Sequence, residues 1–188
     1  MMAERWRIIM ATKHQKFSLN LQGYDDVERE AIAIEVIDKI IKRTRQGKDK
    51  NGDKFDGKYS KGYEQSQAFK IGGKSKGKID LTLSGDMLDS IEILKNSKKV
   101  EIGFQKGSVE NGKADGNIRG TYGQDKPIPG KARDFLGISD SELQSILRKY
   151  PKDSDKAQQR AKELLIKNKE SDRLSGKVDV ADLEEEDG

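Results

Sequence analysis

The chain has 188 residues, of which 32% are hydrophobic and 37% are charged, and its formal net charge is +4. The absence of cysteine and the presence of a single histidine, His14, exclude disulfides, thiolate metal sites, cysteine nucleophiles and two-histidine metal centres. The mean hydropathy is −0.89 and no apolar run approaches the ~20 residues of a membrane span, so the composition argues against a membrane protein.

The length suits one domain with extensions, and the charge pattern divides the chain into three parts. We predict an amino-terminal extension at 1–23, a single domain at 24–150, and a charged helical or disordered tail at 151–188. The stretch 178–188 is acidic and contains no base. A basic body with an acidic tail suggests contact with a polyanion or an acidic protein surface, and it fits a merely solubilising tail equally well.

The strongest helical pattern runs from Tyr24 to Gln46, with acids in its first turn, bases in its last turn and Gly47 after it. Its apolar residues form two rows on opposite sides. One row is Val27, Ala31, Ile34, Ile37 and Ile41, and the other is Ile32, Val36 and Ile40. In so polar a chain this helix must lie between two layers, either within its own domain or between the domain and a neighbouring subunit. We favour the second arrangement and predict that Ile32, Val36 and Ile40 form a subunit interface.

The loop at 48–60 imitates a calcium site without completing it. Asp49, Asn51 and Asp53 match the first ligands of a calcium loop. The required glycine comes two residues early, however, and a serine occupies the twelfth position, where a bidentate glutamate is needed. We therefore predict a turn at Asn51-Gly52 and no metal.

The stretch 72–78 has the spacing of a phosphate-binding loop, but Ile79 stands where a serine or threonine would hold magnesium. The residues after it, 79–83, alternate like a strand, whereas a helix should follow a phosphate-binding loop. We interpret 72–78 as a flexible basic loop and expect no cofactor.

The second half of the chain predicts a hairpin, a loop and two helices. Strands at 90–94 and 100–104 flank a polar turn, and the glycines and prolines of 106–130 indicate a long loop. A capping box opens a helix at Ser139, and a weaker helix follows at 153–169. The predicted class is α+β: a long amino-terminal helix and a carboxy-terminal helix packed on a small, mostly antiparallel sheet, with long polar loops and a charged carboxy-terminal extension.

Three blocks in a fixed order resemble a known family. They are Arg43-Thr44 … Gly47-x-Asp49-x-Asn51-Gly52-x-x-Phe55 … Tyr59-Ser60 … Tyr63, then Leu81-Thr82-Leu83-Ser84-Gly85-Asp86-Met87-Leu88-Asp89-Ser90-Ile91, then Arg133-Asp134-Phe135-Leu136-Gly137-Ile138-Ser139. The combination is similar to the virion morphogenesis and tail-completion (neck) proteins of tailed bacteriophages, over roughly residues 24–150. The resemblance implies a structural virion protein that joins the head connector to the tail, and it maps no catalytic residue onto this chain.

The resemblance also implies partners and a location. Such a protein acts as a homo-oligomeric ring of six or twelve copies, beside neck, portal-adaptor, tail-terminator or tail-tube proteins, with passing contact to genomic DNA. We expect it in the neck or proximal tail of the virion, and in the host cytoplasm during assembly, with no membrane contact. We expect no enzymatic activity, because no carboxylate pair has the spacing and apolar setting of an acid–base site.

A second interpretation is nonspecific nucleic-acid binding by a basic helix end and basic loops. The candidate residues facing DNA or a protein partner are Arg43, Arg45, Lys74, Lys76, Lys78, Arg119 and Lys126. The same charges would also suit the wall of a channel through which DNA passes. Binding that is selective for sequence at physiological salt would favour the second interpretation over the first.

Overall fold

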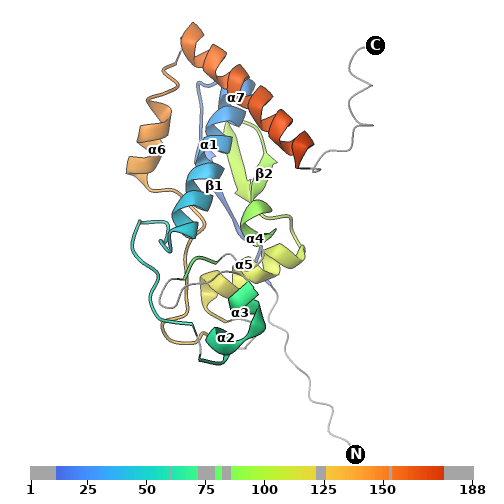
Figure 1. The fold of residues 1–188 in the computed structure, drawn as a ribbon. Coiled ribbons are helices and arrows are strands. Elements are labelled where there is room, and N and C mark those ends of the chain that lie inside the picture. The colour runs from blue at the N-terminus through green and yellow to red at the C-terminus, as the bar shows by residue number, and fades with distance from the viewer. Residues whose placement is uncertain are drawn as a thin grey trace, which may run out of the picture.

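The computed structural model describes residues 12–59, 61–71, 79–81, 86–121, 126–152 and 154–175. Within these ranges helices pack with a three-stranded antiparallel sheet (Figure 1), so the predicted α+β class is confirmed. The elements are β1 (Lys16–Asn20), α1 (Asp26–Arg45), α2 (Lys61–Gln65), α3 (Gln67–Ile71), α4 (Asp86–Asp89), β2 (Glu92–Lys95), β3 (Lys99–Gly103), α5 (Val109–Arg119), α6 (Asp140–Leu147) and α7 (Asp155–Leu174). None of the helices in the described ranges combines the length and apolar character that a membrane span needs.

The sheet has the strand order β1-β3-β2, and both neighbouring pairs are antiparallel. The hairpin of β2 and β3 confirms the prediction from two apolar runs around a polar turn. β1, by contrast, lies inside the segment 1–23 that is predicted as an extension, so the domain begins before residue 24. Phe17 packs against the core and Leu19 is buried in it, while the alternate residues Lys16, Ser18 and Asn20 are exposed.

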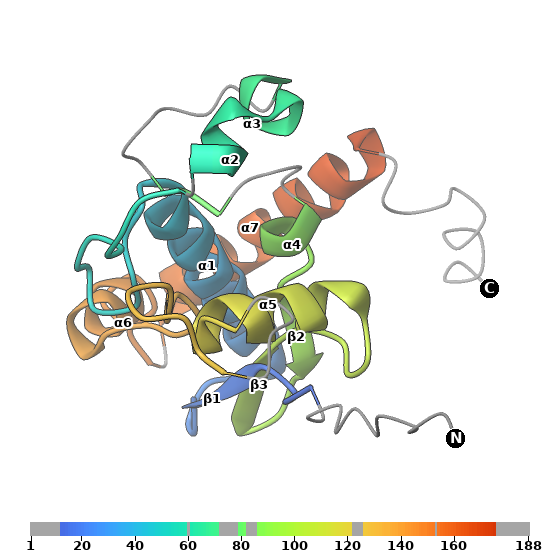
Figure 2. The ribbon, with the colours of Figure 1, turned by 90° about the horizontal axis from the view of Figure 1, so that it is seen from below.

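α1 lies at the centre of the fold, with the sheet along one side and α6 and α7 against it elsewhere (Figure 2). A capping box fixes its first turn. The Asp25 carboxylate accepts the backbone N–H of Glu28 at 2.7 Å, and the Glu28 carboxylate accepts the backbone N–H of Asp25 at 3.1 Å. The predicted long helix is therefore confirmed. The elements that pack against it, β2, β3, α6 and α7, belong to the same chain.

α6 and α7 complete this arrangement. The Ser139 hydroxyl and the Glu142 carboxylate form the capping box predicted for α6, whose stripe buries Ile146 and, just beyond the helix, Tyr150. α7 packs on α1 and fully buries only small side chains, Ala157 and Ala161. Small residues allow two helices to approach closely, so α7 needs no large apolar face to stay attached.

Two segments differ from the prediction. The expected long loop at 106–130 contains α5, which Ser108 caps at its start and Gly120, at φ 70°, ends in the left-handed conformation. Residues 79–81 form no strand, and Leu81 has a φ of 54°, which extended backbone cannot adopt. The rest of the predicted strand at 79–83 lies outside the described residues.

Candidate functional site

The predicted subunit interface is part of the interior. Ile32, Val36 and Ile40 are each 0% exposed and belong to the hydrophobic core cluster together with residues of the sheet and of α6. The row of Ile32, Val36 and Ile40 is enclosed within the chain. In the other row Ala31 is buried, Val27, Ile37 and Ile41 are partly buried against the core, and Ile34 is partly exposed. The interface prediction for these three residues is therefore wrong, and a partner must contact another surface.

Arg43, predicted to face DNA or a partner, is also buried. Its guanidinium donates to the backbone carbonyls of Phe135 at 2.9 Å and Gly137 at 2.8 Å, and to the Glu142 carboxylate at 2.5 Å. A charge in the interior is tolerated only when such partners are present. Arg43 thus ties the end of α1 to the loop before α6, which is a scaffold role.

The same loop is fastened to the turn after α1. The backbone N–H of Lys50 donates to the Asp134 carbonyl at 2.9 Å, and the Lys50 ammonium lies 2.6 Å from the Asp134 carboxylate. Asp49 does not point to a cation: its carboxylate accepts the backbone N–H groups of Asn51 and Asp53, both at 2.9 Å. The predicted turn at Asn51-Gly52 is confirmed, with Gly52 at φ 92°.

The other predicted basic residues are spread over the molecule. Arg45 is half-exposed and pairs with Asp89 at 2.8 Å, while Arg119 pairs with Asp115 on the same helix at 3.6 Å. Lys126 is exposed. Lys74, Lys76 and Lys78 lie outside the described residues. No continuous basic surface connects Arg43, Arg45 and Arg119 in the part of the chain that the structure describes, because the first is buried and the others are paired.

His14, the single histidine, has a hydrogen-bond partner within the fold. Its Nε2 lies 2.7 Å from the Phe104 carbonyl in a partly buried contact. The neighbouring Gln15 bonds α5 through Asn111 and Asp115, each at 2.8 Å. His14 therefore belongs to the contacts that hold the start of the chain to the core. Among the described residues, no group of three or more His, Cys, Asp or Glu could hold a metal ion.

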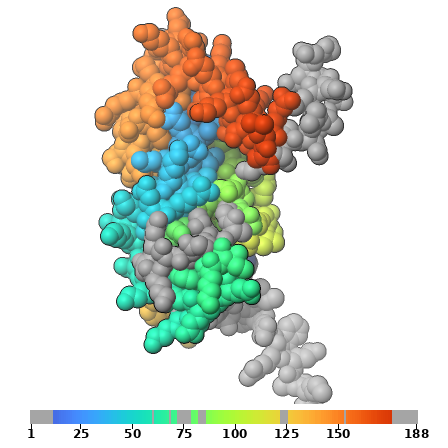
Figure 3. Space-filling view, viewed as in Figure 1, coloured from blue at the N-terminus to red at the C-terminus, as the bar shows by residue number. Residues whose placement is uncertain are grey.

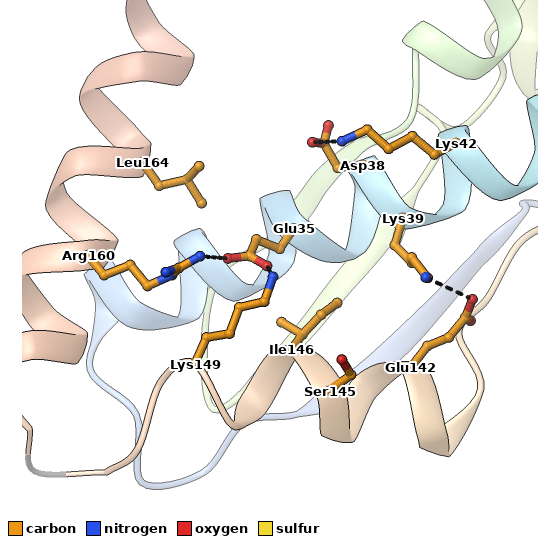
Figure 4. A pocket seen from close by; sticks show the side chains of 10 residues that line it. All are labelled: Glu35, Asp38, Lys39, Lys42, Glu142, Ser145, Ile146, Lys149, Arg160 and Leu164. Atoms are coloured by element: carbon orange, nitrogen blue, oxygen red, sulfur yellow. Dashed lines mark hydrogen bonds and ion pairs between the residues drawn. The ribbon is translucent and has the colours of Figure 1, made fainter.

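Among the described residues, a shallow groove with a volume of about 320 Å³ lies where α1, α6 and α7 meet. Figure 3 shows the blue surface of α1 between the orange surfaces of α6 and α7. We call it the three-helix groove, and its lining is Glu35, Asp38, Lys39, Lys42, Glu142, Ser145, Ile146, Lys149, Arg160 and Leu164. Acids and bases alternate along it, and Figure 4 shows that they pair with one another.

Glu35 is the centre of this charge network. Its carboxylate accepts bonds from Lys149 and from the Tyr150 hydroxyl at 2.8 Å, and lies 3.5 Å from the Arg160 guanidinium. Burial alone would raise the pKa of Glu35, but the hydrogen bonds from Lys149 and Tyr150 and the charges of Lys149 and Arg160 outweigh it and lower the pKa. Burial raises the pKa of Tyr150 to about 12, and the hydrogen bond to Glu35 and the negative charge of Glu35 act in the same direction. The phenol therefore stays protonated and keeps donating.

Sequence reasoning did not find this network. Glu35 stands on α1, Lys149 in the turn after α6 and Arg160 on α7, and the distance along the chain between the first two leaves no local spacing pattern to recognise. Each alone resembles any exposed charge of a polar segment. Only the packing of α6 and α7 on α1 brings them together.

A cluster of three aromatic rings lies apart from the main core, on α2, α3 and the loop before them. Tyr59 and Tyr63 have ring centroids 5.1 Å apart, and each lies 5.6 Å from Phe69. Burial is the main cause that raises the pKa of Tyr59 to about 12. This cluster anchors the long polar segment after α1.

No protein-family model matches the chain, and neither the curated proteins nor the solved structures that were compared with it give a match.

Proposed function

We propose that the protein is a structural subunit of a tailed-phage virion, which completes the tail or joins it to the head connector as part of a ring. It acts by binding neighbouring subunits and not by catalysis. The resemblance of the three sequence blocks is the origin of this proposal. Its location would be the neck or proximal tail.

One contact carries the proposal furthest. Arg43 begins the first block, and its guanidinium donates to the carbonyls of Phe135 and Gly137, which belong to the third block. Two blocks that are separated by about 90 residues in sequence thus meet through a single buried side chain. The contact supports treating the first and third blocks as parts of one structural unit.

The surface for a neighbouring subunit is then the three-helix groove. Unlike Ile32, Val36 and Ile40, several charged residues of the groove reach solvent; the Lys42 side chain is 71% exposed and the Asp38 side chain is 60% exposed. Exposed ion pairs contribute little to the fold, so they can exchange partners at low cost when another chain supplies charges. The alternating signs favour a partner with a complementary pattern and disfavour a long run of one sign.

The test is deletion of the gene in the phage that encodes it, followed by electron microscopy and mass spectrometry of the particles. We expect separate heads and tails without the protein, and joined particles that contain it after complementation. Joined, infectious particles that lack the protein would overturn the proposed function.

The groove is tested separately with Lys42→Glu, which reverses one exposed charge. Lys113→Glu is the matched control, because Lys113 is a half-exposed lysine paired with Glu110 on α5, away from the groove. We expect the first variant to fold and to reduce complementation, and the second to complement normally. Normal complementation by both would reject the groove as the contact surface while leaving the function itself standing.

A further inference from the structure

β1 has an open edge. The Phe104 N–H donates to the Gln15 carbonyl at 3.1 Å and the Leu21 N–H donates to the Lys98 carbonyl at 3.0 Å, so odd-numbered residues turn their backbone groups toward β3. In an antiparallel ladder the residues between them turn theirs away. Those residues are Lys16, Ser18 and Asn20. Within the described residues, their backbone N–H groups meet no acceptor.

The opposite edge of the sheet is different. β2 is short, and its register shifts between Ile93 and Lys95, which marks a bulge. The chain that leaves β2 is tied to the start of α1, where the Asn96 amide donates to the Asp26 carbonyl at 3.1 Å. Bulges and short strands are devices by which proteins protect a sheet edge. Only β1 therefore offers a regular ladder to an incoming strand.

We propose that β1 is a self-association surface, through which two copies pair antiparallel with Ser18 opposite Ser18 of the second copy. This joins two three-stranded sheets into one sheet of six strands, with a twofold axis at Ser18. The inference does not rest on the proposed function, since it concerns the free protein.

The sequence of β1 suits this register. Antiparallel pairing centred on Ser18 places all three outward-facing residues in hydrogen-bonded pairs, which exchange two backbone bonds each. Phe17 falls opposite Leu19 of the second copy on the core side of the sheet, which covers the part of Phe17 that remains exposed. Lys16 falls opposite Asn20, so no like charges face each other. A second copy is therefore the occupant that this edge fits best.

The contact is small, because it consists of one short strand from each copy. Interfaces below about 1,000 Å² belong to weak or transient complexes. We expect a reversible monomer–dimer equilibrium that sedimentation equilibrium or native mass spectrometry detects at high protein concentration, with a mass that doubles.

Ser18→Pro tests the edge. Proline removes the N–H that faces outward and leaves the bonds of Phe17 and Leu19 to β3 in place, and proline is tolerated on edge strands. Ser18→Thr is the matched control, because it keeps the N–H. We expect Ser18→Pro to remain monomeric with an unchanged circular dichroism spectrum, and Ser18→Thr to dimerise like the wild type.

Substitutions at Asn20 test the register. Asn20→Lys places two lysine pairs across the twofold axis and should weaken dimerisation by about tenfold, whereas Asn20→Glu should strengthen it, with both effects shrinking as salt rises. A folded Ser18→Pro protein that dimerises normally, or equal dimerisation of the two Asn20 variants, would overturn the proposal. A wild type that stays monomeric at every concentration would also overturn the proposal. The open edge of β1 would then be a site for a strand of another protein.

Discussion

Arg43 and Glu142 are separated by 99 positions in sequence, yet their side chains meet at 2.5 Å with only 4% and 18% of their surfaces exposed. The Glu142 carboxylate also accepts the backbone N–H of Ser139, so one group serves both the cap of α6 and the end of α1. The position at which α6 lies on α1 is therefore set by a charge pair as well as by apolar packing.

Replacing Arg43 by lysine should destabilise the protein strongly. Lysine keeps the charge but lacks the planar fork that reaches the Phe135 and Gly137 carbonyls together with Glu142. We expect a loss of about 3 kcal/mol in the free energy of unfolding, measured by urea denaturation. Arg45→Lys, at an exposed pair on the same helix, should change stability by less than about 0.5 kcal/mol. Equal effects of the two substitutions would contradict the role of Arg43.

The substitution Val36→Asp tests whether Val36 is buried within its own chain or at a contact between subunits. Val36 is 0% exposed, so a carboxylate there would lie in the core without a partner. We expect a loss of more than about 4 kcal/mol and a largely unfolded protein by circular dichroism. A folded monomer that only fails to assemble would restore the interface prediction for this helix face.

The two carboxy-terminal helices differ in how they begin, and this difference is measurable. The Ser139 hydroxyl accepts the backbone N–H of Glu142 at 3.4 Å, whereas Ser154 makes no side-chain cap bond at the start of α7. Ser139→Ala should therefore cost about 1 kcal/mol of stability and Ser154→Ala close to none. Thermal unfolding of both variants checks this, and a larger effect at Ser154 would refute it.

The contribution of Glu35 should depend on pH. Because Lys149, Tyr150 and Arg160 hold the pKa of Glu35 below its ordinary value, the stabilisation is present above the pKa of the unfolded chain, about 4.3, and is lost as pH falls through the lower pKa of the folded state. The stability difference between wild type and Glu35→Gln should then be larger at pH 7 than at pH 3.

Asp38→Asn provides the control for this experiment, since Asp38 lies on the same helix in an exposed pair with Lys42. Urea unfolding of the three proteins at both pH values gives the comparison. The contrary result is a difference in the free energy of unfolding between wild type and Glu35→Gln that is the same at pH 7 and pH 3. That result would show that Lys149, Tyr150 and Arg160 do not stabilise the Glu35 anion.

Local signals in the sequence were sufficient for the helices that carry them. α1 and α6 have capping boxes at Asp25 and Ser139, and the hairpin has apolar runs on either side of a polar turn. These features act within a few residues, so their effect can be read without knowledge of the fold.

Several of the errors concern contacts between distant segments. β1 is held by β3, roughly 80 residues away, and Asn111 and Asp115 of α5 bond to Gln15, about 100 positions before them. The two apolar rows of α1 were correctly identified, but periodicity cannot tell whether the same chain or another one covers them. Arg43 was predicted to lie at the surface for the same reason. The carbonyls that it binds, those of Phe135 and Gly137, are far from it in sequence, so no local pattern indicates the contact.

The irregularity between Ile93 and Lys95 has a consequence for the size of any assembly built through the sheet. A copy that has paired through β1 has used its sole regular edge and cannot recruit a third copy in the same way. Growth by strand addition would stop at two chains, and the paired chains would not extend into fibrils through the sheet.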